Sequence, residues 1–229
     1  MIDTLLFDLD NTLLDFDKAE ANALTKALGE AGITMTDEMC NRYNKINLAQ
    51  WKLLEQGILT REEVKLRRFQ ILFEEFAIDA AEEEEDVAGY YQRYLGQGHY
   101  FIEGAEEVLE ELSKKYRIYL VTNGTLSVQT GRLESSGIKK YLQGVFISEE
   151  IGYNKPSKEY FEKCFSKIPD FKKENTMIIG DSLSSDIQGG INAGIKTIWF
   201  HRSQDLTEDP QPKPDYEIKS LKSLLEMLK

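Results

Sequence analysis

The sequence predicts an α/β protein whose doubly wound parallel sheet is interrupted, after its first strand, by an all-helical insertion. Three observations lead to this prediction: a short apolar run at 4–10, helical spacing through 15–100, and strand and helix patterns that alternate after it. Alternating strands and helices indicate right-handed βαβ units. We therefore expect an α/β core at 1–14 and 101–229 and a helical unit at 15–100, a division that suits 229 residues.

The first run, TLLFDLD, is apolar on both faces, which is typical of a buried parallel strand. In the insertion, Asp17 with Glu20 resembles a capping box that opens a helix, and Gly32 would end it. Further helices are expected at 37–56 and 80–95, with a Thr60–Glu63 capping box between them. The later core is expected to contain strands at 117–122, 145–148, 176–180 and 196–200, with helices at 104–115, at 126–136, from Pro156 and near 186–193.

Composition narrows the class of protein. Hydrophobic residues make up 41% and charged residues 30% of the chain, as in soluble globular proteins. No apolar run is long enough for a membrane span, and the N-terminus does not resemble a signal peptide, so we expect a cytoplasmic protein. The net charge of −12 argues against binding to nucleic acid polymers.

The metal-ligating residue types other than carboxylates are scarce. Cys40 and Cys164 stand in no motif and are expected to be reduced structural thiols. His99 and His201 are too few for a histidine-based zinc site. The acidic run at 82–86 is interpreted as a solvated helix start.

Polar side chains follow three of the expected strands, and a fourth segment, with Lys155, precedes an expected helix. In open parallel sheets, ligands bind at the carboxyl ends of the strands. Each segment alone has an ordinary structural explanation, such as a turn, a helix cap or a first-turn proline. Their joint placement is what these explanations do not account for. The residues that we expect to converge are Asp8, Asp10, Thr122, Asn123, Gly124, Lys155, Asp181 and Asp186.

This set matches the needs of phosphoryl transfer. Carboxylate oxygens suit Mg²⁺, and a carboxylate can also attack phosphorus. Two like charges about 4 Å apart repel by roughly 4 kcal/mol at an effective dielectric constant near 20. An ionised Asp8 therefore needs cations to approach a phosphate, and Mg²⁺ and Lys155 would supply them. Thr122, with the main-chain N–H groups of Asn123 and Gly124, can cradle phosphate oxygens.

Four segments resemble the signature motifs of haloacid dehalogenase (HAD) superfamily phosphatases: FDLDNTLLD (7–15), VTNG (121–124), GYNKP (152–156) and GDSLSSD (180–186). The resemblance implies a Rossmann-like core and a mobile helical cap of the C1 type. It implies that Asp8 is the nucleophile and a Mg²⁺ ligand, and that Asp10 is the general acid and base and binds Mg²⁺ through its carbonyl. Thr122, Asn123, Gly124 and Lys155 would bind phosphate, Asp181 would complete the metal ligands, and Asp186 would support them.

Asp10 bears on the reaction type. The related dehalogenases lack an acid at this position because halide leaves without a proton. An alkoxide needs one, and a positioned acid is worth about 10²–10⁴-fold in rate. Asp10 therefore favours phosphate esters over a dehalogenase reaction, and no feature indicates a mutase.

A closer resemblance is to non-standard pyrimidine 5′-nucleotidases, carried by TNG…RLESSGI, ISEEIGYNKPSKEYF and GDSLSSDIQGGINAGIKTIWF. It implies a nucleoside monophosphate as the small-molecule partner, with base selection in the cap. A phosphatase of sugar or other metabolite phosphates is the alternative. A tryptophan in a helix is more often part of a core than a base-stacking residue. The candidate cap residues are Asn44, Asn47, Trp51 and Arg67.

Two other classes are less compatible with the sequence. A receiver-type phosphoacceptor would carry its phosphorylated acid on a middle strand and would have no helical insertion. A non-catalytic binding protein is disfavoured because Asp8, Asp10, Lys155 and Asp181 are all present. The oligomeric state does not follow from the sequence.

Overall fold

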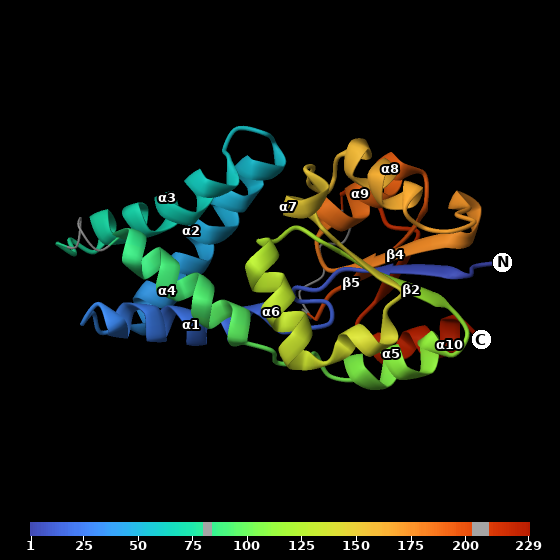
Figure 1. Cartoon of the computed structure of the whole chain (residues 1–229), viewed down its shortest axis with the longest axis horizontal. Helices are drawn as coiled ribbons and strands as arrows, with labels where there is room; N and C mark the ends of the chain where they lie inside the picture. Colours follow the sequence, from blue (N-terminus) through green and yellow to red (C-terminus); the bar gives the residue numbers. More distant parts are fainter. Residues whose placement is uncertain (80–83, 203–210) are drawn as a thin grey trace. The chain divides into compact units, whose positions relative to one another are not determined.

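The computed structural model describes residues 1–79, 84–202 and 211–229. Its core is a six-stranded, all-parallel sheet in the order β3-β2-β1-β4-β5-β6, so that the first strand lies near the middle and the chain winds outward in both directions (Figure 1). This is the doubly wound α/β fold that the sequence predicts. The strands are β1 (Thr4–Phe7), β2 (Arg117–Thr122), β3 (Gly144–Ile147), β4 (Thr176–Gly180), β5 (Lys196–Phe200) and β6 (Tyr216–Ile218).

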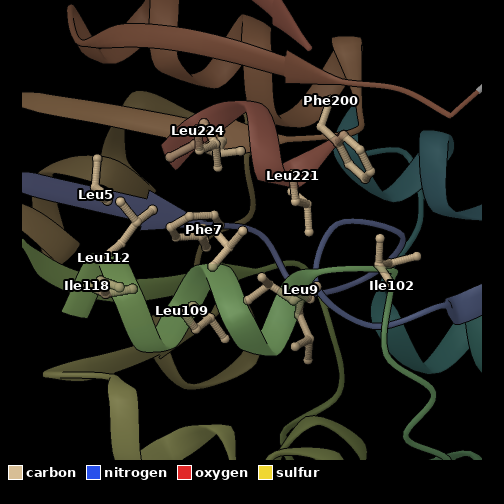
Figure 2. Packing of buried hydrophobic residues seen from close by; sticks show 14 of the residues in the cluster. Leu5, Phe7, Leu9, Ile102, Leu109, Leu112, Ile118, Phe200, Leu221 and Leu224 are labelled. Carbon is tan, nitrogen blue, oxygen red and sulfur yellow. The ribbon is translucent and has the colours of Figure 1, made fainter. Parts of the chain in front are cut away.

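The two faces of the sheet bury different residues because side chains alternate along a strand. Leu5 and Phe7 of β1 belong to one buried cluster, shown in Figure 2, together with Leu109 of a covering helix. Leu6 belongs to the cluster on the opposite face, with Phe161. Both faces of β1 are therefore dry, which explains its uninterrupted apolar sequence.

Helices cover both faces of the core. α5 (Ala105–Ser113) and α10 (Leu224–Met227) lie on one face, and α8 (Lys158–Ser166) and α9 (Gln188–Ala193) on the other (Figure 1). A short π-helix at Leu183–Ile187 precedes α9. The remaining core elements are α6 (Leu126–Ser136), α7 (Ser148–Ile151) and 3₁₀ turns at Ile138–Tyr141, Lys173–Asn175 and Leu221–Ser223.

The chain divides into two compact units, one formed by Met1–Phe16 and His99–Lys229 and the other by Asp17–Gly98. The second unit is helical in its described residues and contains most of α1 (Phe16–Glu30) and all of α2 (Asp37–Glu55), α3 (Arg61–Glu75) and α4 (Glu84–Gln97). None of the described helices is long and apolar enough to cross a membrane.

The two predicted capping boxes of the helical insertion had different outcomes. The Thr60–Glu63 capping box is confirmed, since both of its reciprocal hydrogen bonds are present. The capping box of Asp17 with Glu20 is wrong: the helix begins at Phe16, whose N–H donates to Asn11 Oδ1. Glu20 instead turns into the interior of the helical unit, because buried donors satisfy its carboxylate there.

The helix expected from Pro156 begins later, at Lys158, because the Ser157 side chain caps it by accepting from the N–H of Tyr160. The edge strand β6 and helix α10 were not predicted. The acidic run at 82–86 lies partly outside the described residues, so its expected role as a helix start stays a prediction.

Candidate active site

A buried ammonium group links two carboxylates at the carboxyl end of the sheet. Lys155 Nζ lies 2.5 Å from Asp8 Oδ1 and 2.7 Å from Asp186 Oδ1, and it donates to the carbonyl of Val121 at 2.9 Å. Asp8 directly follows β1, whose ladder continues through a hydrogen bond from the Asp8 N–H to the carbonyl of Ile179. The Lys155 and Asp186 side chains are each only 1% exposed, so these charges are held away from water.

Negative charge exceeds positive charge in this cluster. One carboxylate oxygen from each of Asp8, Asp181 and Asp186 lies within 4.8 Å of the others. Burial raises the pKa of Asp8 to about 7 against the pull of Lys155. Burial, together with the charges of Asp8 and Asp186, also raises the pKa of Asp181 well above its usual value. An all-oxygen set of carboxylates, two of them buried and one half-buried, suits a hard divalent cation such as Mg²⁺.

The pKa of Lys155 reflects the same excess of carboxylates over ammonium groups. Burial alone would lower the pKa of Lys155, but the carboxylates of Asp186 and Asp8 outweigh it and raise the pKa above its usual value. Lys155 therefore stays charged at any physiological pH. It supplies a permanent positive charge beside the carboxylate of Asp8.

The loop after β4 fixes Asp186 in place. Its Oδ2 accepts from the N–H of Ser182 at 3.1 Å. Ser182 is the N-cap of the short π-helix that contains Asp186. A Cβ atom on Gly180 would lie 2.2 Å from that same oxygen, so only glycine leaves room for the carboxylate. The carbonyl of Asp181 accepts from Trp199 Nε1 at 2.7 Å, which ties the loop to β5. Because Lys155 and Ser182 already bind Asp186, its position favours a supporting role.

The segment after β2 joins the site to the loop that carries Lys155. The Asn123 side chain donates to the carbonyl of Lys155 and accepts from its N–H, both at 2.8 Å. The Asn123 amide therefore holds the backbone of Lys155 in place. Thr122 is buried and its hydroxyl accepts from Gln129 at 2.9 Å. That hydroxyl keeps its own hydrogen for a second partner.

Two residues that the sequence reading missed hold Asp10. Arg132 Nη1 forms an ion pair with Asp10 Oδ1, and Gln129 Nε2 donates to Asp10 Oδ2 at 2.7 Å. Both partners lie on α6, which begins directly after segment 122–124. Their spacing of three residues places them on one helix face, but nothing in that spacing shows that the face is buried against Asp10.

The four cap candidates occupy different environments in the helical unit. Asn47 is buried between Glu20 and Arg68, and the Asn44 amide, with its nitrogen turned toward Glu20, lies 2.7 Å from Oε2 of that carboxylate. Trp51 is half-buried and packs against a small apolar cluster, as a core tryptophan does. Arg67 is exposed and donates to Gln50 at 3.3 Å.

The chain is similar to known proteins over nearly its whole length. A family model described as haloacid dehalogenase-like hydrolase matches residues 5–200. Pyrimidine 5′-nucleotidase PynA of Streptococcus pneumoniae is 43% identical, over 98% of this chain and 94% of its own length. Pyrimidine 5′-nucleotidase YjjG of Escherichia coli is 28% identical over 99% of this chain and 97% of its own. The magnesium-bound crystal structure of YfnB from Bacillus subtilis, described as revealing interdomain movement, superimposes with a TM-score of 0.93 at 39% identity, covering 100% of this chain and 99% of that one.

Proposed function

Since the chain belongs to the haloacid dehalogenase-like hydrolase family, we propose that it hydrolyses phosphate monoesters through a phosphoryl group carried on Asp8. The protein is a phosphoric monoester hydrolase, and the proposal concerns its mechanism, metal and substrate. The observation that carries the mechanism is the placement of the Asp8 carboxylate against a buried ammonium and beside two further carboxylates, the buried one of Asp186 and the half-buried one of Asp181.

In the proposed reaction, an Asp8 carboxylate oxygen attacks phosphorus while the bond from phosphorus to the ester oxygen breaks. Asp10 donates its proton to the departing alkoxide. Water then attacks the phosphorus of the aspartyl-phosphate, Asp10 takes a proton from that water, and inorganic phosphate leaves with Asp8 regenerated. Lys155 holds the Asp8 carboxylate and the phosphate oxygens together, while Thr122 and the main-chain N–H groups of 123–124 bind the phosphate.

Asp8 and Asp181, with the main-chain carbonyl of Asp10, would hold a Mg²⁺ ion, and Asp186 would support them. Their oxygen donors and excess negative charge suit that ion. When bound, Mg²⁺ would supply positive charge that offsets the repulsion between the Asp8 carboxylate and a phosphate. Addition of EDTA should abolish turnover and excess Mg²⁺ should restore it, whereas full activity in the chelator would contradict the metal requirement.

The nucleophile is tested by Asp8→Asn, which removes the attacking oxygen anion and should abolish turnover of 4-nitrophenyl phosphate. The matched control is Asp170→Asn, an exposed residue with a φ of 51°, a conformation that asparagine adopts as readily. The control should keep wild-type kcat. Acid quenching of the wild type with radiolabelled substrate should trap label on the protein, and the Asp8→Asn variant should trap none. Wild-type kcat in Asp8→Asn would reject the nucleophile assignment.

We infer that the substrate is a nucleoside monophosphate, with a pyrimidine base preferred. Support comes from the two relatives named as pyrimidine 5′-nucleotidases, one of them 43% identical. A panel of pyrimidine and purine monophosphates and sugar phosphates tests this through kcat/KM. If sugar phosphates exceed every pyrimidine monophosphate, the nucleotidase assignment fails and the general phosphatase assignment stands.

The helical unit is the proposed cap and the proposed place of base selection. Arg67 is exposed and Trp51 half-buried, so both retain surface for a ligand, whereas Asn44 and Asn47 face Glu20 and would act by shaping that surface. Arg67→Ala and Trp51→Ala should raise KM for the best nucleotide severalfold and leave 4-nitrophenyl phosphate unaffected. Equal changes for both substrates would count against base selection at these residues.

A further inference from the structure

The Asp10 carboxyl group is bound on both of its oxygens by one face of α6. Oδ1 pairs with Arg132, and Oδ2 accepts from Gln129 at 2.7 Å. The two donors are also bonded to each other, since Arg132 Nη1 donates to Gln129 Oε1 at 3.1 Å. Because each oxygen accepts from a different donor, the carboxyl group cannot rotate out of its plane without breaking a hydrogen bond. Each oxygen still keeps a lone pair for a proton.

The two donors are themselves held rigidly. The Arg132 side chain is 0% exposed and Gln129 is 1% exposed, so neither can swing into solvent. The Phe16 ring lies over the Arg132 guanidinium, with 5.7 Å from the ring centroid to Cζ. A Cβ atom on Gly124 would lie 2.5 Å from the Gln129 side chain, so the glycine of the phosphate-binding segment leaves the space that Gln129 occupies.

Gln129 also joins two parts of the site. Its Nε2 donates to Asp10 Oδ2 and, at 2.9 Å, to Thr122 Oγ1. One amide group thus sets the spacing between the residue that handles the proton and the hydroxyl that faces the phosphate. In a reaction that passes a proton to the ester oxygen, that spacing decides whether the proton arrives.

We propose that Gln129 and Arg132 are positioning residues that orient the Asp10 carboxyl group toward the ester oxygen of the substrate. This inference rests on the proposed phosphatase mechanism and adds two residues to it. Arg132 lies with Gln129 on the buried face of α6, and a buried guanidinium charge beside the site is otherwise costly and needs a partner such as Asp10.

The test uses the basicity of the leaving group. Nitrophenolate is a weak base and leaves without a proton, whereas the alkoxide of uridine 5′-monophosphate or glycerol phosphate needs one. In Arg132→Met, kcat/KM for the alkyl esters should fall about 10²-fold, the cost of misplacing a catalytic group by about 1 Å. For 4-nitrophenyl phosphate, the factor by which kcat/KM falls should be about ten times smaller. Arg132→Lys should recover part of the loss because it restores a donor and the charge.

Gln129→Met provides a second variant that removes the amide without leaving a buried charge unpaired. It should shift the ratio of the two kcat/KM values in the same direction, by about threefold to tenfold. The matched control is Arg117→Met, which removes a partly buried arginine paired with Asp3 at the opposite end of the sheet. It should leave the ratio unchanged even if it lowers thermal stability.

The outcomes separate the two proposals. If Arg132→Met or Gln129→Met lowers both substrates by the same factor, or neither, the positioning role is wrong while the phosphatase mechanism stands. If Arg132→Met fails to fold, Gln129→Met alone decides between these outcomes. If the wild type hydrolyses no phosphate ester, the proposed function is wrong and the positioning role falls with it.

Discussion

Two clusters of charged and polar side chains in the described part of the chain, one around Lys155 in the core and one around Glu20 in the helical unit, differ in charge balance. In the core, the ammonium of Lys155 contacts the carboxylates of Asp8 and Asp186, and that of Asp181 lies beside them. In the helical unit, the one carboxylate of Glu20 accepts from Asn47 and Tyr91, and Arg68 donates to Asn47 at 3.0 Å. The guanidinium of Arg68 lies 4.5 Å from the centroid of the Tyr91 ring.

The difference separates a site from a structural network. The helical cluster sets one acid, Glu20, against one base, Arg68, and surrounds them with neutral donors, so its charges balance without a ligand. The core cluster holds an excess of negative charge in a buried place, which costs stability unless a cation joins it. Charge imbalance, more than burial, marks the core cluster as the functional one.

The largest expected effect comes from removing the only ammonium of the core cluster. Lys155→Met should lower kcat by about 10³-fold, because a preorganised positive charge at the phosphate is lost. It should also lower the free energy of unfolding by about 3–5 kcal/mol, since buried carboxylates lose their partner. Enzyme assays and urea unfolding measure the two effects, and added Mg²⁺ should recover part of the stability.

The control for that variant is Lys158→Met, which removes an exposed lysine paired with Glu162 on the surface of α8. Exposed pairs of this kind contribute about 0.3–0.5 kcal/mol. A loss of stability in Lys155→Met no greater than in this control would mean that the core cluster tolerates its negative charge.

The next effect concerns the cluster around Glu20 in the helical unit and depends on pH. Burial raises the pKa of Glu20 to about 7, against the pull of Arg68, from 4.5 in the unfolded chain. The folded chain therefore keeps a proton that the unfolded chain has already released. The stability that Glu20 contributes is fully present below pH 4.5 and is lost as the pH rises through about 7, a change of about 3 kcal/mol.

Glu20→Gln removes the titrating group while keeping an acceptor for Asn47 and Tyr91. The difference in unfolding free energy between wild type and variant should favour the wild type more at pH 5 than at pH 8. Hydrogen exchange of peptides from α1 and α2 in the full chain reports on this unit alone. A difference that does not vary with pH would show that Glu20 is ionised in the folded state throughout this range.

The smallest of the three effects tests a contact distance. Gly180→Ala would place a Cβ atom 2.2 Å from Asp186 Oδ2 and 2.3 Å from its Cγ, so the carboxylate must shift away from Lys155. We expect kcat/KM to fall about 10–10²-fold. The matched control is Gly29→Ala in α1, where a Cβ meets nothing within 4 Å and should add about 0.5–1 kcal/mol of stability. Wild-type kcat/KM in Gly180→Ala would mean that the position of Asp186 is not critical.

Much of the core could be predicted because its strands are short, continuous apolar runs. The strands at 117–122, 176–180 and 196–200 have the expected bounds, since both faces of a central parallel strand are buried and the signal is undiluted. β6 was missed for the opposite reason: it lies at the sheet edge and two of its three residues are exposed.

The site was predictable where its residues end strands, and not where they lie on helices. Asp8, Lys155 and Asp181 follow from strand ends and loop motifs, and the structure brings them together. Gln129 and Arg132 stand in a helix whose sequence looks like an ordinary polar surface. Their burial follows from the tertiary position of α6 over Asp10, which no local pattern contains.

Leu9 stands between Asp8 and Asp10, the two carboxylates of the proposed reaction, and is itself fully buried in the cluster of Figure 2. Its carbonyl accepts from the N–H groups of Leu13 and Leu14, which turns the chain back on itself directly after Asp10. The turn that carries Asp8 and Asp10, the proposed nucleophile and the proposed proton donor, is thus anchored by a residue whose side chain lies in the core. Directed evolution of this enzyme should therefore find both gains and losses of rate from substitutions at Leu9, a buried hydrophobic residue that lies outside the proposed reaction.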